Sequence, residues 1–142
     1  MRFVLASDHA GVELKREISA WLERDGREVT DLGTMDAASV DYPDYAHRLA
    51  RAIASASHER GILICGTGIG MSMAANRHAG VRAALCGDVF SARMTRLHND
   101  ANVLCLGARV VGVGLALEIL QTFVRTEFEG GRHARRTAKI EP

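Results

Sequence analysis

The sequence predicts an α/β fold, a doubly wound, five-stranded parallel sheet with helices on both faces and therefore three layers. Short apolar runs alternate with stretches of helical periodicity over the whole length, as in successive strand–helix–strand units. The sequence shows no internal repeat, low-complexity segment or linker, and 142 residues suit one domain. We therefore expect a single domain over residues 1–142, with residues 128–142 as a C-terminal extension.

The first part of the chain shows this alternation. Residues 3–6 are apolar and predict a strand, and residues 8–11 predict a loop. Residues 12–22 predict a helix, because apolar side chains recur near helical spacing between charged ones. An Asp-Gly pair ends this helix, and residues 28–32 predict the second strand.

The rest of the chain continues in the same way. Pro43 suits the first turn of a helix that runs to about residue 57. Residues 61–65 predict a buried strand, and the glycine-rich residues 66–70 predict a loop. Further elements are expected at residues 71–77 (helix), 81–86 (strand), 89–97 (helix), 102–106 (strand) and 112–126 (helix). From residue 128 onward the chain is expected to be irregular.

Charge and composition exclude several classes of protein. The chain has 18 Lys and Arg against 17 Asp and Glu, a formal charge of +1. Nucleic acids and anionic membranes select a larger basic excess, so neither is expected as a partner. No apolar run approaches the roughly 20 residues of a membrane span, and no signal-peptide pattern is present. Three cysteines in apolar stretches indicate reduced thiols, so we expect a cytoplasmic protein.

A ligand is expected at one edge of the predicted sheet. Right-handed crossovers place the loops that follow the strands along the carboxyl edge, where doubly wound sheets bind ligands. The residues expected in this crevice are Asp8, His9, Asp41, Tyr42, residues 65–70, Asp88 and the stretch around His98.

The segment Cys65-Gly66-Thr67-Gly68-Ile69-Gly70 suits an anion, either a phosphate or an oxyanion formed in a reaction. Its glycines let backbone N–H groups turn toward one point, and a helix N-terminus follows. A P-loop is excluded because no lysine lies between Lys15 and Lys139, and a cysteine-phosphatase loop is excluded because Met71 replaces the required arginine. A dinucleotide loop with Asp88 as the ribose ligand, and a turn without any ligand, remain alternatives.

Cys65 is the candidate nucleophile or base. It ends a strand and faces a helix N-terminus, an environment that favours the thiolate. A thiolate in a water-poor pocket can attack a substrate or abstract a proton. Cys86 and Cys105 are interpreted as small buried hydrophobic residues.

Histidines, acidic residues and arginines leave alternatives open. Asp8 suits an N-cap, although Asp8 and His9 both meet the crevice. The His98-Asn99-Asp100 segment suits either a turn or a site. The six histidines lack His-x-x-x-His spacing, so no metal site is expected. Arg132 and Arg136 suit a solvated tail, which composition alone favours, or a phosphate clamp one helical turn apart.

Five segments, in order, resemble the type B ribose-5-phosphate isomerase family, which includes galactose-6-phosphate and related sugar-phosphate isomerases. They are Ser7-Asp8-His9-Ala10-Gly11, Asp41-Tyr42-Pro43, residues 61–70, His98-Asn99-Asp100-Ala101-Asn102-Val103 and Glu129-Gly130-Gly131-Arg132-His133. The resemblance covers nearly the whole chain. It implies a Rossmann-like, flavodoxin-type fold without metal or cofactor, and a homodimer, or a dimer of dimers, with shared active sites. Met71 stands where one branch of the family has a glutamate base, which places the chain in the cysteine branch.

The resemblance also implies a reaction, aldose–ketose interconversion through a cis-enediolate. His98, helped by Asp8, would transfer the proton that opens the sugar ring. Cys65 would then move a proton between C2 and C1. Backbone N–H groups of residues 66–70 would stabilise the intermediate, and Thr67 would carry a proton between its oxygens.

The remaining residues of the implied site bind the substrate. His9, Arg132 and Arg136 would hold the phosphate. The partner chain would supply Arg109 to the phosphate, together with His98 and Asn99. Asp41 and Tyr42 would lie along the sugar. The implied substrate pair is ribose 5-phosphate and ribulose 5-phosphate. Alternatives are galactose 6-phosphate, allose 6-phosphate or a tetrose phosphate, and a non-catalytic module that binds a phosphate or nucleotide. We expect the loop at residues 34–39 and the tail after Arg136 to set the sugar length.

Overall fold

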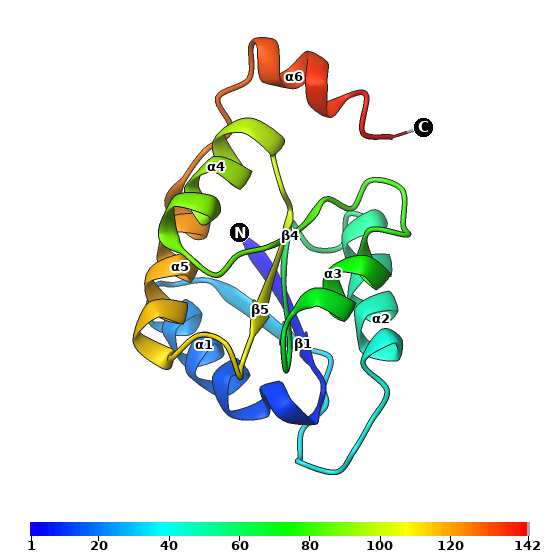
Figure 1. Cartoon of the computed structure of the whole chain (residues 1–142), viewed down its shortest axis with the longest axis vertical. Helices are drawn as coiled ribbons and strands as arrows, with labels where there is room; N and C mark the ends of the chain where they lie inside the picture. The colour runs from blue at the N-terminus through cyan, green and yellow to red at the C-terminus, as the bar shows by residue number, and fades with distance from the viewer. Residues whose placement is uncertain (142) are drawn as a thin grey trace.

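The computed structural model describes residues 1–141 and contains a sheet of five strands whose neighbours are all parallel (Figure 1). The strands are β1 (Arg2–Ser7), β2 (Glu28–Asp31), β3 (Arg60–Cys65), β4 (Ala83–Leu85) and β5 (Val103–Gly107). The helices are the 3₁₀ turn η1 (His9–Gly11), α1 (Val12–Arg24), α2 (Tyr42–Ala54), α3 (Ile69–Ala75), α4 (Val89–Asn99), α5 (Val113–Arg125) and α6 (Arg132–Thr137). Pro142, the last residue of the predicted extension, lies outside the described residues.

The strand order is β2-β1-β3-β5-β4, which confirms the predicted doubly wound, Rossmann-like fold. Compared with the flavodoxin order 2-1-3-4-5, the last two strands are exchanged. The order reverses between β1 and β3, so the loops after these two strands flank the switch point at the carboxyl edge. Ligands of doubly wound sheets bind at such a point.

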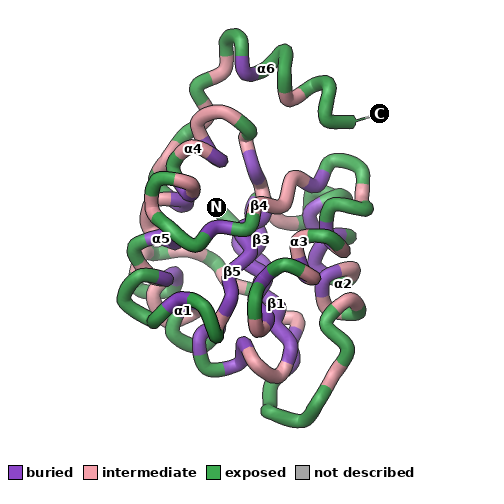
Figure 2. Tube along the Cα trace, viewed as in Figure 1, coloured by how far each residue is buried: buried purple, intermediate pink, exposed green. Residues whose placement is uncertain are grey.

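The helices form a layer on each face of the sheet (Figure 1). Along β3, Ile62 and Ile64 join a core with side chains of α1 and α5, whereas Leu63 and Cys65 join the core beneath α2 and α3. Successive strand residues point to opposite faces, so both faces of a parallel strand must be apolar. Figure 2 accordingly shows the central strands buried and the outer turns of the helices exposed. No described helix has the length and apolar character needed to cross a membrane.

Several predicted boundaries shift by a few residues, two of them for clear local reasons. Helix α3 begins at Ile69 instead of residue 71, because Gly68, at φ +78°, already turns the chain into the helix. Strand β4 is shorter than predicted. The backbone N–H of Arg82 donates to the side chain of Asn102 (2.8 Å) instead of to a backbone carbonyl of the sheet.

The prediction of an irregular chain after residue 128 is wrong, because Arg132–Thr137 form α6. Gly130 and Gly131, at φ +70° and +56°, turn the chain so that α6 lies against the end of α4 (Figure 1). The N–H of Glu129 donates to the carbonyl of Leu97 at 3.1 Å and fastens this turn. The helix was missed because His133 is its one buried residue, too little for an apolar period.

Candidate active site

Cys65 is the last residue of β3, at the centre of the carboxyl edge of the sheet. It is 5% exposed, and its Sγ accepts the backbone N–H of Gly68 at 3.1 Å. Its carbonyl accepts the N–H of Ala108 at 2.8 Å. The sulfur is therefore held in place by a backbone donor directed at it.

The glycine loop after Cys65 is pressed against the end of β5. A Cβ on Gly68 would lie 2.9 Å from the carbonyl carbon of Leu106, and one on Gly107 would lie 2.7 Å from the carbonyl oxygen of Thr67. Gly68 also has a positive φ, so this turn requires glycine. The loop leads directly into the first turn of α3, whose N–H groups have no acceptor within the helix. The N–H of Ile69 donates to Oγ1 of Thr67 at 3.3 Å, and the N–H groups of Gly70 and Met71 remain available to an anion.

Tyr42 and Asp41 lie beside this loop, as predicted. A Cβ on Gly70 would lie 2.5 Å from two ring carbons of Tyr42, so the phenol ring covers Gly70. Asp41 is the exposed N-cap of α2, and Pro43 lies in the first turn of that helix as expected. Helix α2 therefore presents its N-terminus to the Cys65 loop.

Asp8 and His9 reach the same edge from the end of β1. Asp8 is 7% exposed and accepts the N–H of Ala10 at 2.9 Å, which confirms the predicted N-cap. The Nδ1 atom of His9 accepts the N–H of Val40 at 3.3 Å. In the neutral ring the proton then resides on Nε2, so His9 offers an N–H donor to a ligand.

Arg109 lies over the glycine loop of its own chain, whereas the resemblance implied that a partner supplies it. Its backbone N–H donates to the carbonyl of Gly66 at 3.0 Å. A Cβ on Gly66 would lie 3.4 Å from Nη1 of Arg109. The physical reason is the strand order, because β5 neighbours β3 and the loop after β5 adjoins the loop after β3.

His98 and Asn99 lie at the opposite, amino edge of the sheet, which corrects the place in the crevice expected from the strand pattern; the resemblance implied that a partner chain supplies them (Figure 1). Helix α4 runs antiparallel to the strands and ends beside the start of β4. There, Nε of Arg82 donates to the carbonyl of Asn99 at 3.2 Å. Because His98 precedes a strand instead of following one, a single chain does not bring it to Cys65. Arg132 and Arg136 on α6 lie with His98, not with His9.

His98 forms a cluster with His133 and Glu129. The two imidazole rings stack at 4.2 Å and 12°, and Oε2 of Glu129 lies 3.9 Å from Nε2 of each. Burial, followed by the neighbouring His98, lowers the pKa of His133. These residue types suit a metal ion. An imidazole binds a metal in its own ring plane at about 2.0–2.1 Å, so two nearly parallel stacked rings cannot share one ion as they stand.

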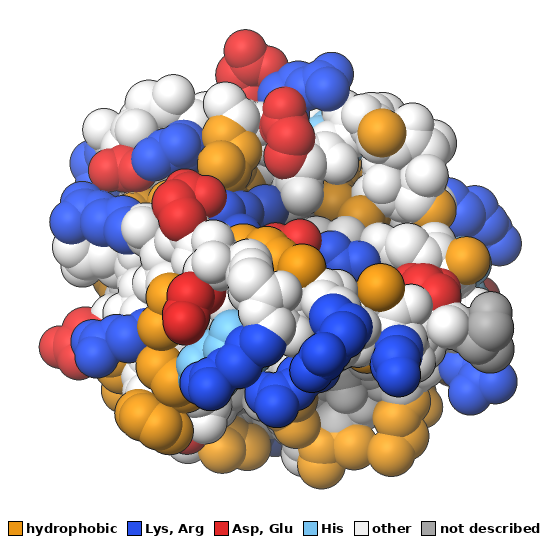
Figure 3. Space-filling model, turned by 90° about the horizontal axis from the view of Figure 1, so that it is seen from above, with side chains coloured by type: hydrophobic (Ala, Val, Ile, Leu, Met, Phe, Trp, Pro, Cys, Tyr) orange, Lys and Arg blue, Asp and Glu red, His pale blue; other side chains and the backbone are white. Residues whose placement is uncertain are grey.

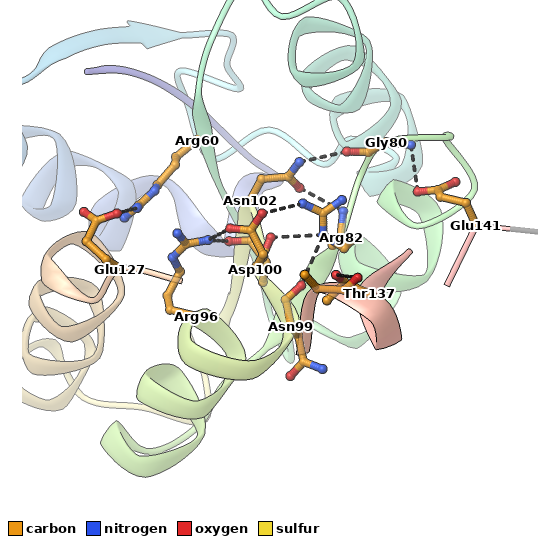
Figure 4. Close-up of polar contacts among 12 residues, drawn as sticks. Arg60, Gly80, Arg82, Arg96, Asn99, Asp100, Asn102, Glu127, Thr137 and Glu141 are labelled. Atoms are coloured by element: carbon orange, nitrogen blue, oxygen red, sulfur yellow. Dashed lines mark hydrogen bonds and ion pairs between the residues drawn. The ribbon is translucent and has the colours of Figure 1, made fainter. Parts of the chain in front are cut away.

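Asp100 holds the end of α4 in place (Figure 4). It adopts φ +46°, and its carboxylate accepts from Nη1 of Arg96 at 2.9 Å and Nη2 of Arg82 at 3.1 Å. Arg96 is 4% exposed, so this pairing also compensates a buried cation. Asp100 therefore forms the turn after α4 and also holds the helix end that carries His98 and Asn99 in place.

A cavity of about 630 Å³ opens at this amino edge, between the end of α3 and the C-terminal segment. Its walls include His78, Arg82, Asn99 and Ile140, and none of the residues around Cys65. Glu141 accepts the N–H of Gly80 at 2.9 Å and ties the C-terminal segment across the cavity (Figure 4).

Asp88, Cys86 and Cys105 near β4 and β5 have structural roles. Asp88 was the candidate ribose ligand of a dinucleotide site. Its carboxylate instead caps α4 and accepts the N–H and the hydroxyl of Ser91 at 2.7 Å each. Cys86 and Cys105 are buried, as predicted. Burial raises the pKa of Cys86 to about 11 and raises that of Cys105 further. Cys65 is thus the one cysteine with a donor on its sulfur among the described residues.

A model of the family described as ribose/galactose isomerase matches residues 3–140. The chain belongs to the ribose/galactose isomerase family. Among curated relatives, ribose-5-phosphate isomerase B of Escherichia coli K12 is 47% identical over 139 residues, 98% of this chain and 93% of that protein. D-erythrulose-4-phosphate isomerase of Pectobacterium atrosepticum is 44% identical over 142 residues, 99% and 93% of the two chains.

Solved structures of this isomerase family have the same fold. Ribose-5-phosphate isomerase B of Clostridium thermocellum matches with a TM-score of 0.97 and 54% identity, over 99% of this chain and 95% of that one. The Mycoplasma genitalium enzyme, solved with bound ribulose-5-phosphate, matches with a TM-score of 0.95 and 45% identity, over 98% and 93%. The family predicted from five short segments is confirmed, and the chain is a sugar phosphate isomerase.

Proposed function

We propose that this isomerase interconverts ribose 5-phosphate and ribulose 5-phosphate through a cis-enediolate, without metal or cofactor. The observation that carries the proposal is the buried thiol of Cys65, which accepts a backbone N–H beside an anion-binding loop at the switch point. Aldose and ketose differ only in the positions of protons and one carbonyl group, so proton transfers suffice. The relatives named for ribose 5-phosphate support this substrate.

In the proposed reaction Cys65 acts first as base and then as acid. The thiolate removes the C2 proton of the open-chain aldose, and the electron pair moves into the enediolate, leaving the charge on O1. The hydroxyl of Thr67 passes the O2 proton to O1. The thiol then returns its proton to C1, and the ketose forms with the thiolate restored. Such a group contributes roughly 10²–10⁴-fold to the rate.

The glycine loop would stabilise the enediolate oxygen. Free N–H groups at the start of α3 and the cationic side chain of Arg109, which lies over Gly66, both favour negative charge there. Arg109 would therefore act from the same chain as Cys65. Removing one such donor typically costs roughly 10²–10³-fold in turnover.

Ring opening needs a group that takes the hemiacetal proton and returns one to the ring oxygen. We assign this step to His98, helped by Asp8. His98 and Cys65 lie at opposite edges of one sheet, so we propose that the two come from different chains. The phosphate would be held by Nε2–H of His9 together with Arg132 and Arg136 of the partner's extension. Figure 3 shows basic side chains gathered on the surface at the α6 end.

We propose that the second chain is another copy of this one, forming a homodimer. Exposed apolar side chains surround the end of β4, on α3, on β4, at the start of α4 and in the loop after β5; they are Ile69, Met73, Leu85, Phe90 and Val110. Monomeric proteins rarely expose such a group, and it adjoins the Cys65 loop. A second copy on this face would cover it and bring its amino edge toward Cys65.

Mixing two inactive variants tests the shared site. A Cys65→Ala chain combined with a His98→Ala chain forms mixed dimers in which one site retains both residues. Random reassortment should restore about a quarter of the parental turnover. Cys65→Ala mixed with Gly68→Ala is the control, because both defects lie at the same edge and no mixed site is whole. A mixture of the first pair that stays inactive contradicts the shared site.

Turnover of four-, five- and six-carbon aldose phosphates tests the substrate. We expect the highest kcat/KM for ribose 5-phosphate. The tetrose alternative is supported by the relative named D-erythrulose-4-phosphate isomerase, 44% identical. A clear preference for a tetrose or hexose phosphate would overturn the ribose assignment, and exchanging the loop at residues 34–39 should then shift the preferred length.

A further inference from the structure

Lys15 stands out among the basic residues because it is buried. The chain has 18 basic residues, and nearly all are arginines. Lys15, on α1, has a side chain only 1% exposed. Its Nζ donates to Oδ1 of Asp31 and to the carbonyl of Thr34, both at 2.6 Å. A compact ammonium fits between these two acceptors, which the planar fork of an arginine would overfill.

Stability alone does not explain a buried cation at this position. Desolvating an ammonium opposes folding, and buried ion pairs can often be replaced by apolar residues of similar size without loss of stability. The pair between Lys15 and Asp31 is better explained by the segment that it holds in place, which is the chain that leaves β2.

This chain segment lies directly against the end of β1. Ser7 donates its N–H to the carbonyl of Gly33 at 2.7 Å and accepts the N–H of Thr34 at 2.8 Å. Asp31 also accepts the N–H of Gly33 at 2.8 Å. Lys15 and Asp31 thus fasten residues 33–34 beside the residue that precedes Asp8.

The other end of the same segment, at Val40, fixes the tautomer of His9. The N–H of Val40 donates to Nδ1 of His9 at 3.3 Å, which leaves the proton on Nε2. Residues 35–39 between these two anchors are exposed, and among the described side chains Arg16 also reaches the segment, by a bond to the carbonyl of Met35. Loss of the Thr34 anchor would loosen Val40 and leave the ring of His9 free to turn.

We propose that Lys15 is a positioning residue of the isomerase site. Its ammonium holds residues 33–40 against β1, and this segment fixes the orientation and tautomer in which His9 meets the phosphate. Lys15 itself touches no substrate. The inference rests on the proposed function, in which His9 binds the phosphate group of the sugar.

The test compares Lys15→Met, the double variant Lys15→Met/Asp31→Asn, and Arg27→Met as a matched control. The double variant leaves no unpaired carboxylate, so its melting temperature should return close to that of the parent. The control loses the ion pair of Arg27 with Asp25 (3.1 Å), at the far end of α1. Measurements are kcat and KM for ribose 5-phosphate, the Kd for inorganic phosphate by calorimetry, and amide hydrogen exchange of Thr34 and Val40.

In both Lys15 variants we expect KM and the phosphate Kd to rise roughly tenfold while kcat changes less. Exchange at Thr34 and Val40 should accelerate by a similar factor, and the control should match the parent. A double variant with parental KM, Kd and exchange overturns the inference. A parent that neither binds phosphate nor turns over a sugar phosphate overturns the proposed function instead, and exchange at Val40 still shows whether Lys15 holds the segment.

Discussion

Replacing Gly68 by alanine tests two properties of the Cys65 loop, its left-handed backbone conformation and its close packing against β5. Gly68 has φ +78°, a conformation that costs an L-residue about 1–2 kcal/mol. Its Cβ would also meet Leu85 Cδ1 at 2.6 Å and the backbone of Leu106 at 2.9 Å. Overpacking against backbone adds about 1–3 kcal/mol. The free energy of unfolding, measured by urea denaturation, should therefore fall by about 2–5 kcal/mol.

Gly80 provides the matched control. It has the same φ of +78°, but a Cβ there would meet no atom within 4 Å. Gly80→Ala should lower the free energy of unfolding only by the conformational cost of about 1–2 kcal/mol, and its turnover should equal that of the parent. Gly68→Ala should lose turnover as well, because the loop must move away from β5. Equal destabilisation by the two substitutions would refute the close approach, and full activity of Gly68→Ala would refute the anion-binding role of the loop.

Three further predictions concern single side chains. Cys65→Ala should lower kcat by roughly 10²–10⁴-fold in steady-state assays while calorimetry shows little change in sugar-phosphate affinity; retained turnover would assign the base elsewhere. Arg132→Ala and Arg136→Ala should each raise KM roughly tenfold, whereas Lys139→Ala should leave it unchanged; equal KM values in all three would return α6 to a solvated tail. The raised pKa of Cys86, from 9.0 to about 11, means that the folded state keeps this proton longer, so the free energy of unfolding should fall as the pH rises from 9 to 11. Urea denaturation across this range checks it, and Cys86→Ala should show a smaller fall.

The sheet and its carboxyl-edge residues could be predicted because their signals are local. Parallel strands buried on both faces appear as continuous apolar runs, as in residues 61–65, and a loop that follows such a run must lie at the carboxyl edge. Cys65, His9 and Tyr42 were found by this argument. His98 was misplaced within the chain because it comes before a strand, so the same argument puts it at the other edge.

The supporting residues could not be predicted, because their partners are distant in sequence. Lys15 meets Asp31 across a helix and a strand, and Asp100 meets Arg82 across the whole of α4. Nothing in composition or spacing selects these pairs among so many charged residues. Helix α6 was missed for a related reason, because its order comes from a contact with α4 and not from its own periodicity.

The shortness of α6 has a thermodynamic consequence. A helix of six residues is not stable alone in water, so the order of α6 depends on contacts with the rest of the chain, among them the stacking of His133 on His98 and the bond from Glu129 to Leu97. Ordering of the extension and immobilisation of the His98 ring are therefore coupled. By linkage, an anion that binds the arginines of α6 in their helical form must also restrict the motion of His98. A ligand that restricts His98 must in turn strengthen anion binding, and the coupling free energy is the same in both directions. Under the proposed mechanism, binding of the substrate's phosphate would therefore also hold the ring-opening residue in place.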